Sequence, residues 1–346
     1  MTEFDPNDVG ISNGNIFGFP VSEEQANIVI IPVPWDATAS YKKGTAYGPQ
    51  AILEASTQLD FYHPGLNHAY NTKVFMTPIS EDWVEINASL SKESLKYLEK
   101  LETVGQNATQ DYQSLIAQIN EASIALTSNL KERCLGLLEQ GKIPAILGGE
   151  HSVPLGLITA LNEVYEDFGI LQIDAHADLR IAYESFQQSH ASIMHNVLDA
   201  CENLSKLVQI GIRDISNTEV NRIEEDRRIE TYFDWKLKED AYSGKTWSET
   251  CEELVKGLPQ NIYISFDIDG LSPYLCPNTG TPVPGGLDFS QISFLFKTIV
   301  KHNKRIIGFD LNEVAPGTEG DWDANVGARV LWELVCTTEI TRLAHV

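Results

Sequence analysis

Short, nearly continuous runs of apolar and β-branched residues recur along this chain and constrain its fold more than any other feature. Six such runs occur, at Asn27–Val33, Ile143–Leu147, Gly169–Ile173, Leu207–Ile212, Ile262–Phe266 and Arg305–Phe309. A strand with one face in water alternates apolar and polar residues, whereas continuous apolar runs are typical of strands that helices bury on both faces. The runs therefore predict a parallel sheet covered by helices.

The segments between these runs have helical periodicity, and the longest spans about residues 110–140. Apolar residues recur there at helical spacing, and the pattern stops at Gly141, a residue type that commonly follows the last turn of a helix. Strands that alternate with helices over most of the chain predict an α/β fold with one sheet of about eight strands.

No linker, low-complexity tract or internal repeat divides the 346 residues, so we expect a single domain over 1–346. Residues 1–22 are expected to form an arm, which either lies on the domain or meets a neighbouring subunit. Residues 81–106 are polar and helix-prone and are expected to form a helical excursion from the sheet. The sequence does not indicate the role of this excursion.

The charge balance limits the partners of the chain. It holds 25 Lys and Arg against 49 Asp and Glu, a formal net charge of −24 at pH 7. Such a surplus repels nucleic acid and anionic lipid, so we expect neither nucleic acid nor a membrane as a partner, and a small cationic substrate suits it better. Five Cys without a CxxC pair, no signal-peptide pattern and no long apolar segment predict a cytoplasmic protein.

Polar clusters directly follow three of the predicted strands. These clusters are Gly148–Ser152, Asp174–Asp178 and Asp267–Gly270. In an open parallel sheet the carboxyl ends of the strands share one edge, which is where ligands bind. Six residues that are far apart in the sequence are therefore expected to meet there: His151, Asp174, His176, Asp178, Asp267 and Asp269.

The composition of this set predicts a metal centre. Four carboxylates forced together raise one another's pKa values unless a cation compensates them. Four negative charges and two imidazoles suit two divalent metal ions, with Asp174 and Asp267 central enough in their clusters to bridge them. A single Asp or His after a strand is more often a helix cap, so the prediction depends on the combination. A carboxylate-rich site without thiolates favours Mn²⁺, then Ni²⁺, and its imidazoles leave cobalt, iron and zinc open.

The three clusters belong to a larger set of motifs through which the sequence resembles the ureohydrolase family, which comprises arginase, agmatinase, formimidoylglutamase and guanidine hydrolase. The other motifs are Pro34–Asp36, Lys43–Pro49 and Gly308–Val314, and the resemblance runs from about Asn27 to the end. It implies an arginase-like, three-layer α/β/α fold with a binuclear manganese site. It also implies homo-oligomers, usually trimers or hexamers, and hydrolysis of a guanidino compound to urea and an amine.

The resemblance also implies roles for individual residues. One metal ion would be held by His151, Asp174, Asp178 and Asp267, and the other by Asp174, His176, Asp267 and Asp269. A water shared by two metal ions becomes a nucleophile near neutral pH, and it would attack the guanidinium carbon. His190 resembles the proton-shuttling histidine of the family, and Glu313 the carboxylate that pairs with the guanidinium. We predict that Asp178 is a catalytic residue as well as a metal ligand. His195 is a further candidate for binding the substrate.

Several positions depart from the agmatinase pattern. The motif His190-Ala191-Ser192 stands where agmatinases commonly have His-Gly-Thr followed by Arg. Glu150 and Leu53 replace a usual Asp and a usual Arg, and no arginase-type loop for an α-amino acid is evident. The stretch Trp35–Thr45 and the extended N-terminal half most resemble the guanidine hydrolase branch. This resemblance implies guanidine hydrolase first, agmatinase as the alternative, and then arginase or formimidoylglutamase.

Free guanidine would need a small pocket with an aromatic ring against the planar cation. Trp35, Tyr41 and Phe186 are the candidates for this stacking. Two other classes of protein remain as rivals. A metal-dependent deacetylase would hold one zinc beside paired His residues and a Tyr, and a non-catalytic relative would have lost ligands, whereas none of the six is missing.

Overall fold

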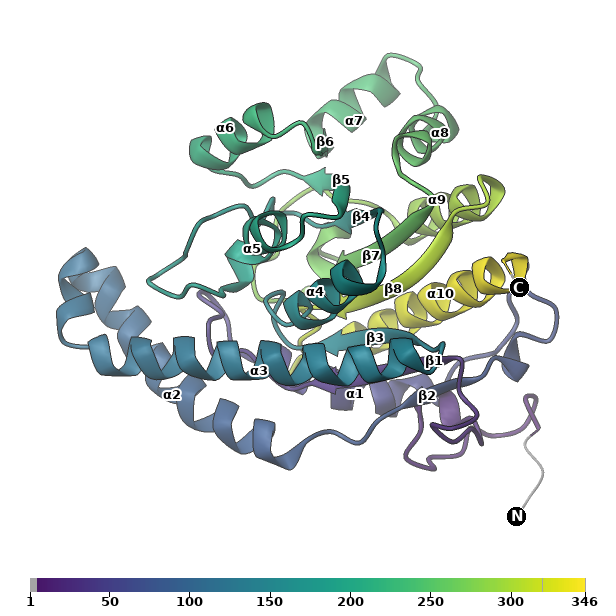
Figure 1. Cartoon of the computed structure of the whole chain (residues 1–346), viewed down its shortest axis with the longest axis horizontal. Helices are drawn as coiled ribbons and strands as arrows, with labels where there is room; N and C mark the ends of the chain where they lie inside the picture. The colour runs from purple at the N-terminus through teal and green to yellow at the C-terminus, as the bar shows by residue number, and fades with distance from the viewer. Residues whose placement is uncertain (1–4, 319, 346) are drawn as a thin grey trace.

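The computed structural model describes residues 5–318 and 320–345, and its centre is one sheet of eight parallel strands (Figure 1). The strands are β1 (Ile28–Val33), β2 (Val74–Met76), β3 (Ile143–Gly148), β4 (Phe168–Ile173), β5 (Leu204–Ile212), β6 (Ile229–Phe233), β7 (Asn261–Asp267) and β8 (Arg305–Asn312). Their order across the sheet is β2-β1-β3-β8-β7-β4-β5-β6. All six predicted strands are present, and the predicted sheet of about eight strands is confirmed.

The two strands that the sequence did not predict are β2 and β6, which form the two edges of the sheet. β2 has only three residues, and β6 is half-buried along most of its length. An edge strand has no second neighbour to cover it, so it does not need the continuous apolar run that reveals an inner strand.

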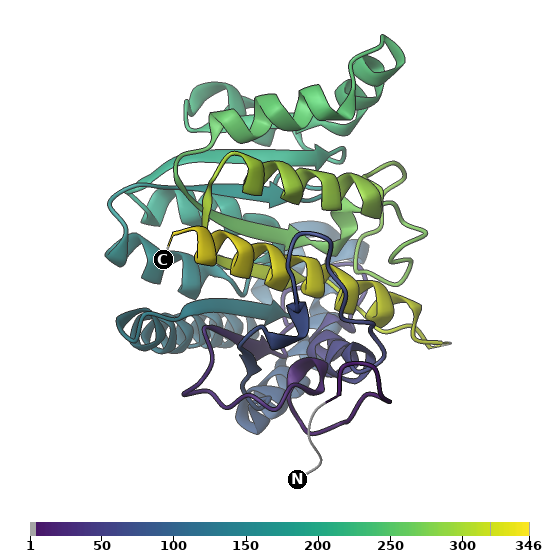
Figure 2. The same cartoon turned by 90° about the vertical axis from the view of Figure 1, so that its right-hand side faces the viewer.

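Helices cover both faces of the sheet. They are α1 (Gly48–Ser56), α2 (Glu81–Val104), α3 (Gln113–Glu139), α4 (Leu155–Val164), α5 (Ile193–Ala200), α6 (Asn217–Glu225), α7 (Asp234–Tyr242), α8 (Trp247–Gly257), α9 (Phe289–Lys301) and α10 (Trp322–Ala344). Figure 2 shows the yellow α10 and the yellow-green α9 lying across one face. The predicted helix at residues 110–140 is α3, and Gly141 follows it with a φ of 72°.

Successive residues of the inner strands enter two different cores. In β1, Ile28 and Ile30 pack into the core that contains α1, α8, α9 and α10, whereas Val29 and Ile31 pack into the core that contains α3, α4 and α5. A strand alternates its side chains between the two faces of the sheet, so a strand between two helical layers is apolar at every position. This confirms the three-layer α/β/α architecture.

The segment expected as a helical excursion contains α2, which lies beside α3 in Figure 1. One of its faces holds the loop that follows β1. The Asn87 side chain accepts a hydrogen bond from the Asp36 amide at 2.8 Å and donates one to the Asp36 carboxylate at 3.0 Å. Ser94 accepts a hydrogen bond from the Lys43 ammonium at 3.0 Å. The helix therefore supports the loop of residues 36–43, a role that the sequence did not indicate.

The described part of the N-terminal arm, from residue 5 onward, packs on the protein's own core at residues 15–19. Phe17 lies edge-on to Trp332 with ring centroids 5.0 Å apart, and Phe19 lies edge-on to Phe61 at 4.9 Å. The Asn15 carboxamide accepts a hydrogen bond from the Met76 amide at 2.9 Å. These residues lie on the domain, a contact of the arm with a neighbouring subunit stays a prediction, and residues 1–4 lie outside the described part of the chain.

Within the described residues, no helix is both long and apolar enough to cross a membrane.

Candidate active site

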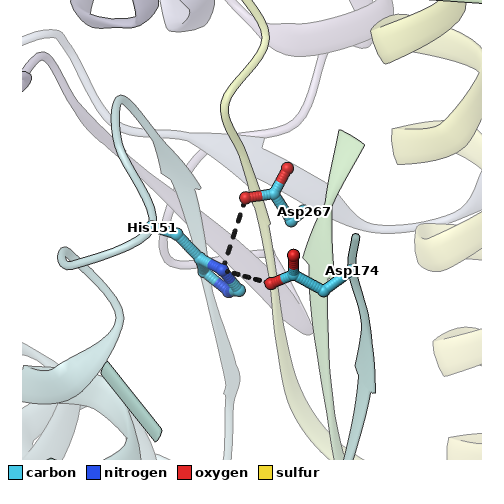
Figure 3. Close-up of side chains that lie close together, drawn as sticks. All are labelled: His151, Asp174 and Asp267. Carbon is cyan, nitrogen blue, oxygen red and sulfur yellow. Dashed lines mark ion pairs between the residues drawn. The ribbon is translucent and has the colours of Figure 1, made fainter. Parts of the chain in front are cut away.

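The three polar clusters follow strands β3, β4 and β7, and the carboxyl ends of these strands lie at the same edge of the sheet. In the order β3-β8-β7-β4 every strand is parallel to the next, so the carboxyl ends share one edge. His151 follows β3, Asp174 follows β4, and Asp267 is the last residue of β7. Figure 3 shows these three side chains pointing toward one another. Parallel pairing thus brings together residues that are distant in the sequence.

The Nδ1 atom of His151 lies at the centre of this group. It is 3.0 Å from a carboxylate oxygen of Asp174, 3.0 Å from one of Asp178 and 3.4 Å from one of Asp267. All four side chains are buried. Nevertheless, Nδ1 forms a hydrogen bond of good geometry with none of them. A buried nitrogen without a hydrogen bond, facing three carboxylate oxygens, is the arrangement expected of a metal ligand.

The other ring nitrogen of His151 is held from behind. Its Nε2 lies 2.9 Å from the Ser265 hydroxyl, which donates a hydrogen bond to Asp310 at 3.2 Å. With the Ser265 hydrogen committed to Asp310, Nε2 carries the imidazole proton and donates to Ser265. That tautomer leaves the lone pair on Nδ1, and such supporting hydrogen bonds commonly orient a ligating histidine.

A second group of possible ligands contains Asp174, His176 and Asp269. His176 Nδ1 lies 3.1 Å from a carboxylate oxygen of Asp269 and 3.6 Å from one of Asp174. Asp174 belongs to both groups, as a bridging ligand would, whereas Asp267 falls only in the group of His151. Bridging by Asp174 and Asp267 stays a prediction.

The charges of this cluster are uncompensated without cations. Burial, reinforced by the charge of Asp174, raises the pKa of Asp178 to about 7. Burial and then the charges of Asp269 and Asp174 hold the pKa of Asp267 well above its usual range. At Asp174, burial opposes ionisation, but the close approach of the His151 and His176 imidazoles outweighs it and lowers the pKa. The raised pKa values mean that the carboxylates of Asp178 and Asp267 bind protons readily when no metal ion is bound. Divalent cations would neutralise the same oxygens, so this set of donor atoms fits a binuclear centre.

His190 is positioned by the loop that follows β1. Its Nε2 lies 3.2 Å from the Ser40 hydroxyl, and its amide donates a hydrogen bond to the Thr38 hydroxyl at 3.3 Å. The Tyr183 ring lies edge-on to the imidazole at a centroid distance of 5.8 Å. Burial, with the positive charges of His176 and Lys43, lowers the pKa of His190 to about 3. The imidazole is therefore neutral at pH 7.

Glu313 follows β8 with a left-handed backbone conformation, φ 63°. Its carboxylate accepts a hydrogen bond from the His151 amide at 2.8 Å, and its own amide donates to the Gly149 carbonyl at 2.8 Å. Burial, with the charge of Glu150 next, holds the pKa of Glu313 well above its usual range. A bound cation would reverse this effect, so the carboxyl suits a positively charged ligand.

Glu150, the Glu that replaces a usual Asp, does not line the cavity but organises the loop that holds His190. Its two oxygens accept hydrogen bonds from the Thr38 amide at 2.9 Å and the Thr38 hydroxyl at 2.5 Å. Thr38 in turn contacts His190. The buried Lys43 ammonium supports the same loop by donating to the carbonyls of Asp36 and Ala37 at 2.8 and 3.1 Å. The sequence did not single out Thr38 or Ser40, because small polar residues in a loop carry no motif of their own, and it gave Lys43 only as the first residue of the motif Lys43–Pro49.

One cavity of about 150 Å³ collects the predicted chemistry. Among its lining residues are six predicted for the site: His151, His176, Asp178, His190, Asp267 and Glu313. Asp174 and Asp269 lie buried next to this lining. The lining also includes Ser40, Arg180, Tyr183 and Asp214, which are partly or fully exposed, and the buried Glu219.

Four predicted residues do not reach the cavity, which corrects the expectation for the substrate site. Trp35 is buried edge-on against Trp83, with ring centroids 6.1 Å apart, because the loop after β1 turns its ring toward α2. Phe186 packs in the core against Tyr97, and Tyr41 is exposed to solvent. His195 on α5 faces Asp199 at 3.4 Å. Tyr183 supplies the aromatic ring of the cavity instead.

Comparisons with known proteins agree with this geometry. The sequence profile of the arginase family matches residues 26–336. The chain is 30% identical over 308 residues to N(1)-aminopropylagmatine ureohydrolase of Thermus thermophilus, covering 89% of this chain and 88% of the relative. It is 26% identical over 317 residues to agmatinase of Bacillus subtilis, covering 90% and 92%. The crystal structure of agmatine ureohydrolase of Thermoplasma volcanium superposes with a TM-score of 0.71 over 96% of both chains, at 23% identity.

Proposed function

Because the chain belongs to the arginase family, whose members hydrolyse guanidino compounds, we propose that it is a metal-dependent ureohydrolase with its active site in the cavity described above. It adds water to the guanidinium carbon of a small guanidino compound and releases urea and an amine. The observation that carries this proposal is the convergence of the buried ligand cluster, His190 and Glu313 on one cavity of about 150 Å³.

The residues proposed to hold two divalent ions are His151, Asp174, His176, Asp178, Asp267 and Asp269. Divalent ions in such a site supply Lewis acidity, which makes water nucleophilic near neutral pH. Mn²⁺ is proposed first and Ni²⁺ second, because carboxylates outnumber imidazoles and no thiolate contributes. The homo-oligomer and the cytoplasmic location stay predictions.

Glu313 is proposed to bind the guanidinium head of the substrate. A guanidinium stays protonated at ordinary pH and presents paired N–H donors, which a carboxylate can accept side by side. The carboxyl of Glu313 is held by the His151 amide, on the loop that also carries a proposed metal ligand. The substrate carbon would thereby be fixed relative to the metal site.

His190 is proposed to move the proton. Attack of water on the guanidinium carbon releases a proton, and the leaving nitrogen must gain one, because an amide anion cannot leave in water. The neutral imidazole accepts the first proton and returns it to the leaving nitrogen, so that the products are urea and a protonated amine. The hydrogen bond between Ser40 and Nε2 keeps the ring in place for both transfers.

Two substrate candidates have support from different observations. The relatives named for agmatine and aminopropylagmatine favour a guanidine with an alkyl substituent, which raises the agmatinase alternative above our first expectation. The small volume of the cavity favours free guanidine, the candidate that we placed first from the sequence. Arginine and formimidoylglutamate follow.

The test uses the full chain loaded with Mn²⁺ or with Ni²⁺. Guanidine, agmatine and arginine are assayed for urea release and formimidoylglutamate for formamide, while bound metal is counted by elemental analysis. We expect urea from at least one guanidino compound and about two metal ions per chain. One tightly bound zinc ion without urea would support the deacetylase rival, and no bound metal would support the non-catalytic one.

A further inference from the structure

A two-residue turn beside the cavity has a backbone conformation that its own residues disfavour. Tyr183 and Phe186 pair across it, with the Phe186 amide donating to the Tyr183 carbonyl at 2.9 Å and the Tyr183 amide donating to the Phe186 carbonyl at 3.1 Å. The two residues between them, Glu184 and Ser185, have φ values of 53° and 70°. Such a turn usually has Asn followed by Gly at these positions, because most L-residues avoid positive φ. Contacts from elsewhere in the molecule must therefore stabilise this turn.

Tyr97 on α2 supplies the first of these contacts. Its hydroxyl donates a hydrogen bond to the Glu184 carbonyl at 3.1 Å, and its ring lies edge-on to the Phe186 ring with centroids 5.9 Å apart. Both rings are buried in the core that contains α3, α4 and α5, where close packing restricts their movement. The hydroxyl therefore holds the first central residue of the turn from a rigid position.

Asn120 on α3 holds the second central residue of the turn. Its carboxamide nitrogen donates a hydrogen bond to the Ser185 carbonyl at 3.2 Å, and its carboxamide oxygen accepts one from the Gln187 amide at 2.9 Å. Because the same side chain donates and accepts along one stretch of backbone, both bonds orient the carboxamide. Together with Tyr97, Asn120 stabilises the positive φ values of the turn.

The turn matters for the site because Tyr183, which begins it, lines the cavity. The Tyr183 ring contacts the guanidinium of Arg180, whose central carbon is 4.6 Å from the ring centroid. It also contacts the imidazole of His190, with centroids 5.8 Å apart and an angle of 85° between the rings. Tyr183 therefore forms one wall of the space that the imidazole occupies, and the position of this wall depends on the turn.

Helix α2 also supports the other neighbour of the imidazole. The Ser40 hydroxyl, 3.2 Å from Nε2 of His190, belongs to the loop that Asn87 and Ser94 of α2 hold by hydrogen bonds. One helix outside the sheet thus supports both loops whose side chains contact the proposed proton carrier.

We propose that Tyr97 and Asn120 are positioning residues for His190, which act through the turn of residues 183–186 and the Tyr183 ring. This inference rests on the proposed ureohydrolase function. A proton carrier must stay within hydrogen-bond reach of the reacting atoms, so a shift of its neighbour lowers the rate even when metal ions and substrate are bound. The helical excursion, whose role the sequence does not indicate, thereby contributes to the geometry of proton transfer.

The first measurement is hydrogen exchange at single-amide resolution, which does not depend on activity. The Phe186 amide reports closure of the turn, because it donates to the Tyr183 carbonyl. We expect this amide to exchange about tenfold faster in Tyr97→Phe and in Asn120→Ala than in the wild type. Glu184→Asn with Ser185→Gly introduces residue types that favour positive φ, and in the Asn120→Ala background it should return the exchange rate to within about twofold of the wild type.

The second measurement is urea release by the Mn²⁺-loaded full chain from the guanidino compound that the wild type hydrolyses fastest. We expect kcat to fall by about tenfold in Asn120→Ala, which loses two hydrogen bonds, and by about fivefold in Tyr97→Phe, which loses one. KM should stay within about twofold and metal content at about two ions per chain. Glu184→Asn with Ser185→Gly should restore most of the kcat of Asn120→Ala.

A double-mutant cycle and a matched control complete the test. In a Tyr183→Ala background, Asn120→Ala should lower kcat by less than about twofold further, because the ring that transmits its effect is gone. Tyr232→Phe removes the same atom as Tyr97→Phe from a partly buried ring on β6, where the hydroxyl donates to Glu230 at 2.8 Å. This control should change neither kcat nor the exchange of the Phe186 amide.

The outcomes separate the two proposals. If Tyr97→Phe and Asn120→Ala lower Tm or speed exchange without lowering kcat, or if Asn120→Ala lowers kcat equally with and without Tyr183, the positioning role is overturned and the ureohydrolase function stands. Unchanged exchange of the Phe186 amide in both variants also overturns it. If no guanidino compound yields urea from the wild type, the ureohydrolase function fails, and the positioning of its proton carrier fails with it.

Discussion

The floor of the cavity is made of strand ends, whereas its mouth is made of loops. The floor comprises the predicted ligands and Glu313, and the mouth comprises Ser40, Arg180, Tyr183 and Asp214. Floor residues such as Asp174 and Asp267 are at most 3% exposed, while the side chain of Asp214 at the mouth is 70% exposed. A strand end cannot shift without its neighbours, but a loop can change without disturbing the core. We therefore expect the floor to determine the reaction and the mouth to determine the substrate.

Removing the carboxylate shared by both ligand groups should have the largest effect and tests the floor directly. Asp174→Asn takes a charged oxygen from the groups of His151 and of His176 together. We expect urea release to fall by about 1,000-fold or more, and bound metal to drop below about two ions per chain.

The control for this variant is Asp240→Asn, which removes a carboxylate from α7 outside the cavity and should leave both quantities unchanged. Full activity with full metal content in Asp174→Asn would show that Asp174 does not bridge, and the floor would then not be the common element of the reaction.

His190 lies where floor and mouth meet, because its partners Ser40 and Tyr183 belong to the mouth. His190→Asn removes the proposed proton carrier and leaves the predicted ligand cluster intact, so we expect kcat to fall by about 100-fold or more while elemental analysis still finds about two metal ions per chain. His345→Asn near the C-terminus is the matched control. Loss of metal in His190→Asn would assign this residue to the floor instead.

The same division explains how much the sequence could predict. The predicted ligands of the floor follow apolar strands as short polar motifs. Parallel pairing requires strand ends to share an edge, so Asp174 and His176 could be placed there from the sequence. The family and the three-layer fold were recognised from these motifs and are confirmed. The prediction that Trp35 stacks on the substrate depended on its aromatic type alone. A loop can turn such a ring toward the core or toward the cavity, and the contact with Trp83 shows that this ring faces the core.

Protons and metal ions should compete for the carboxylates of the floor. The stability of the metal-free protein should therefore depend on pH. The pKa of Asp178 rises from its usual 3.8 to about 7 on folding, so the folded state binds more protons between these values than the unfolded state. Its contribution to stability is therefore lost as the pH rises toward 7. His151, whose pKa is also raised, acts in the same direction.

Thermal unfolding in a chelator, with and without added Mn²⁺, measures this competition. We expect the Tm increase on adding Mn²⁺ to be larger at about pH 8 than at about pH 6, by about 3 °C or more. Asp178→Asn should reduce this difference, since it removes one of the groups that exchange a proton for a cation. An equal Tm increase at both pH values would mean that the floor is not held together by protons when metal is absent.

The smallest effect is expected at Ser40, which belongs to the mouth yet contacts His190. Ser40→Ala removes the hydroxyl 3.2 Å from Nε2 and leaves the amide contact of His190 with Thr38 in place. One hydrogen bond to a neutral ring contributes about 1 kcal/mol, so kcat should fall by about fivefold with metal content unchanged. Ser128→Ala on the exposed face of α3 is the control. Because the hydroxyl contacts the ring that we propose as the proton carrier, the loss should appear in kcat and not in KM for any of the guanidino compounds. A loss confined to the KM of substrates with a charged substituent would instead assign Ser40 to substrate selection, and the boundary between floor and mouth would then lie at the imidazole of His190.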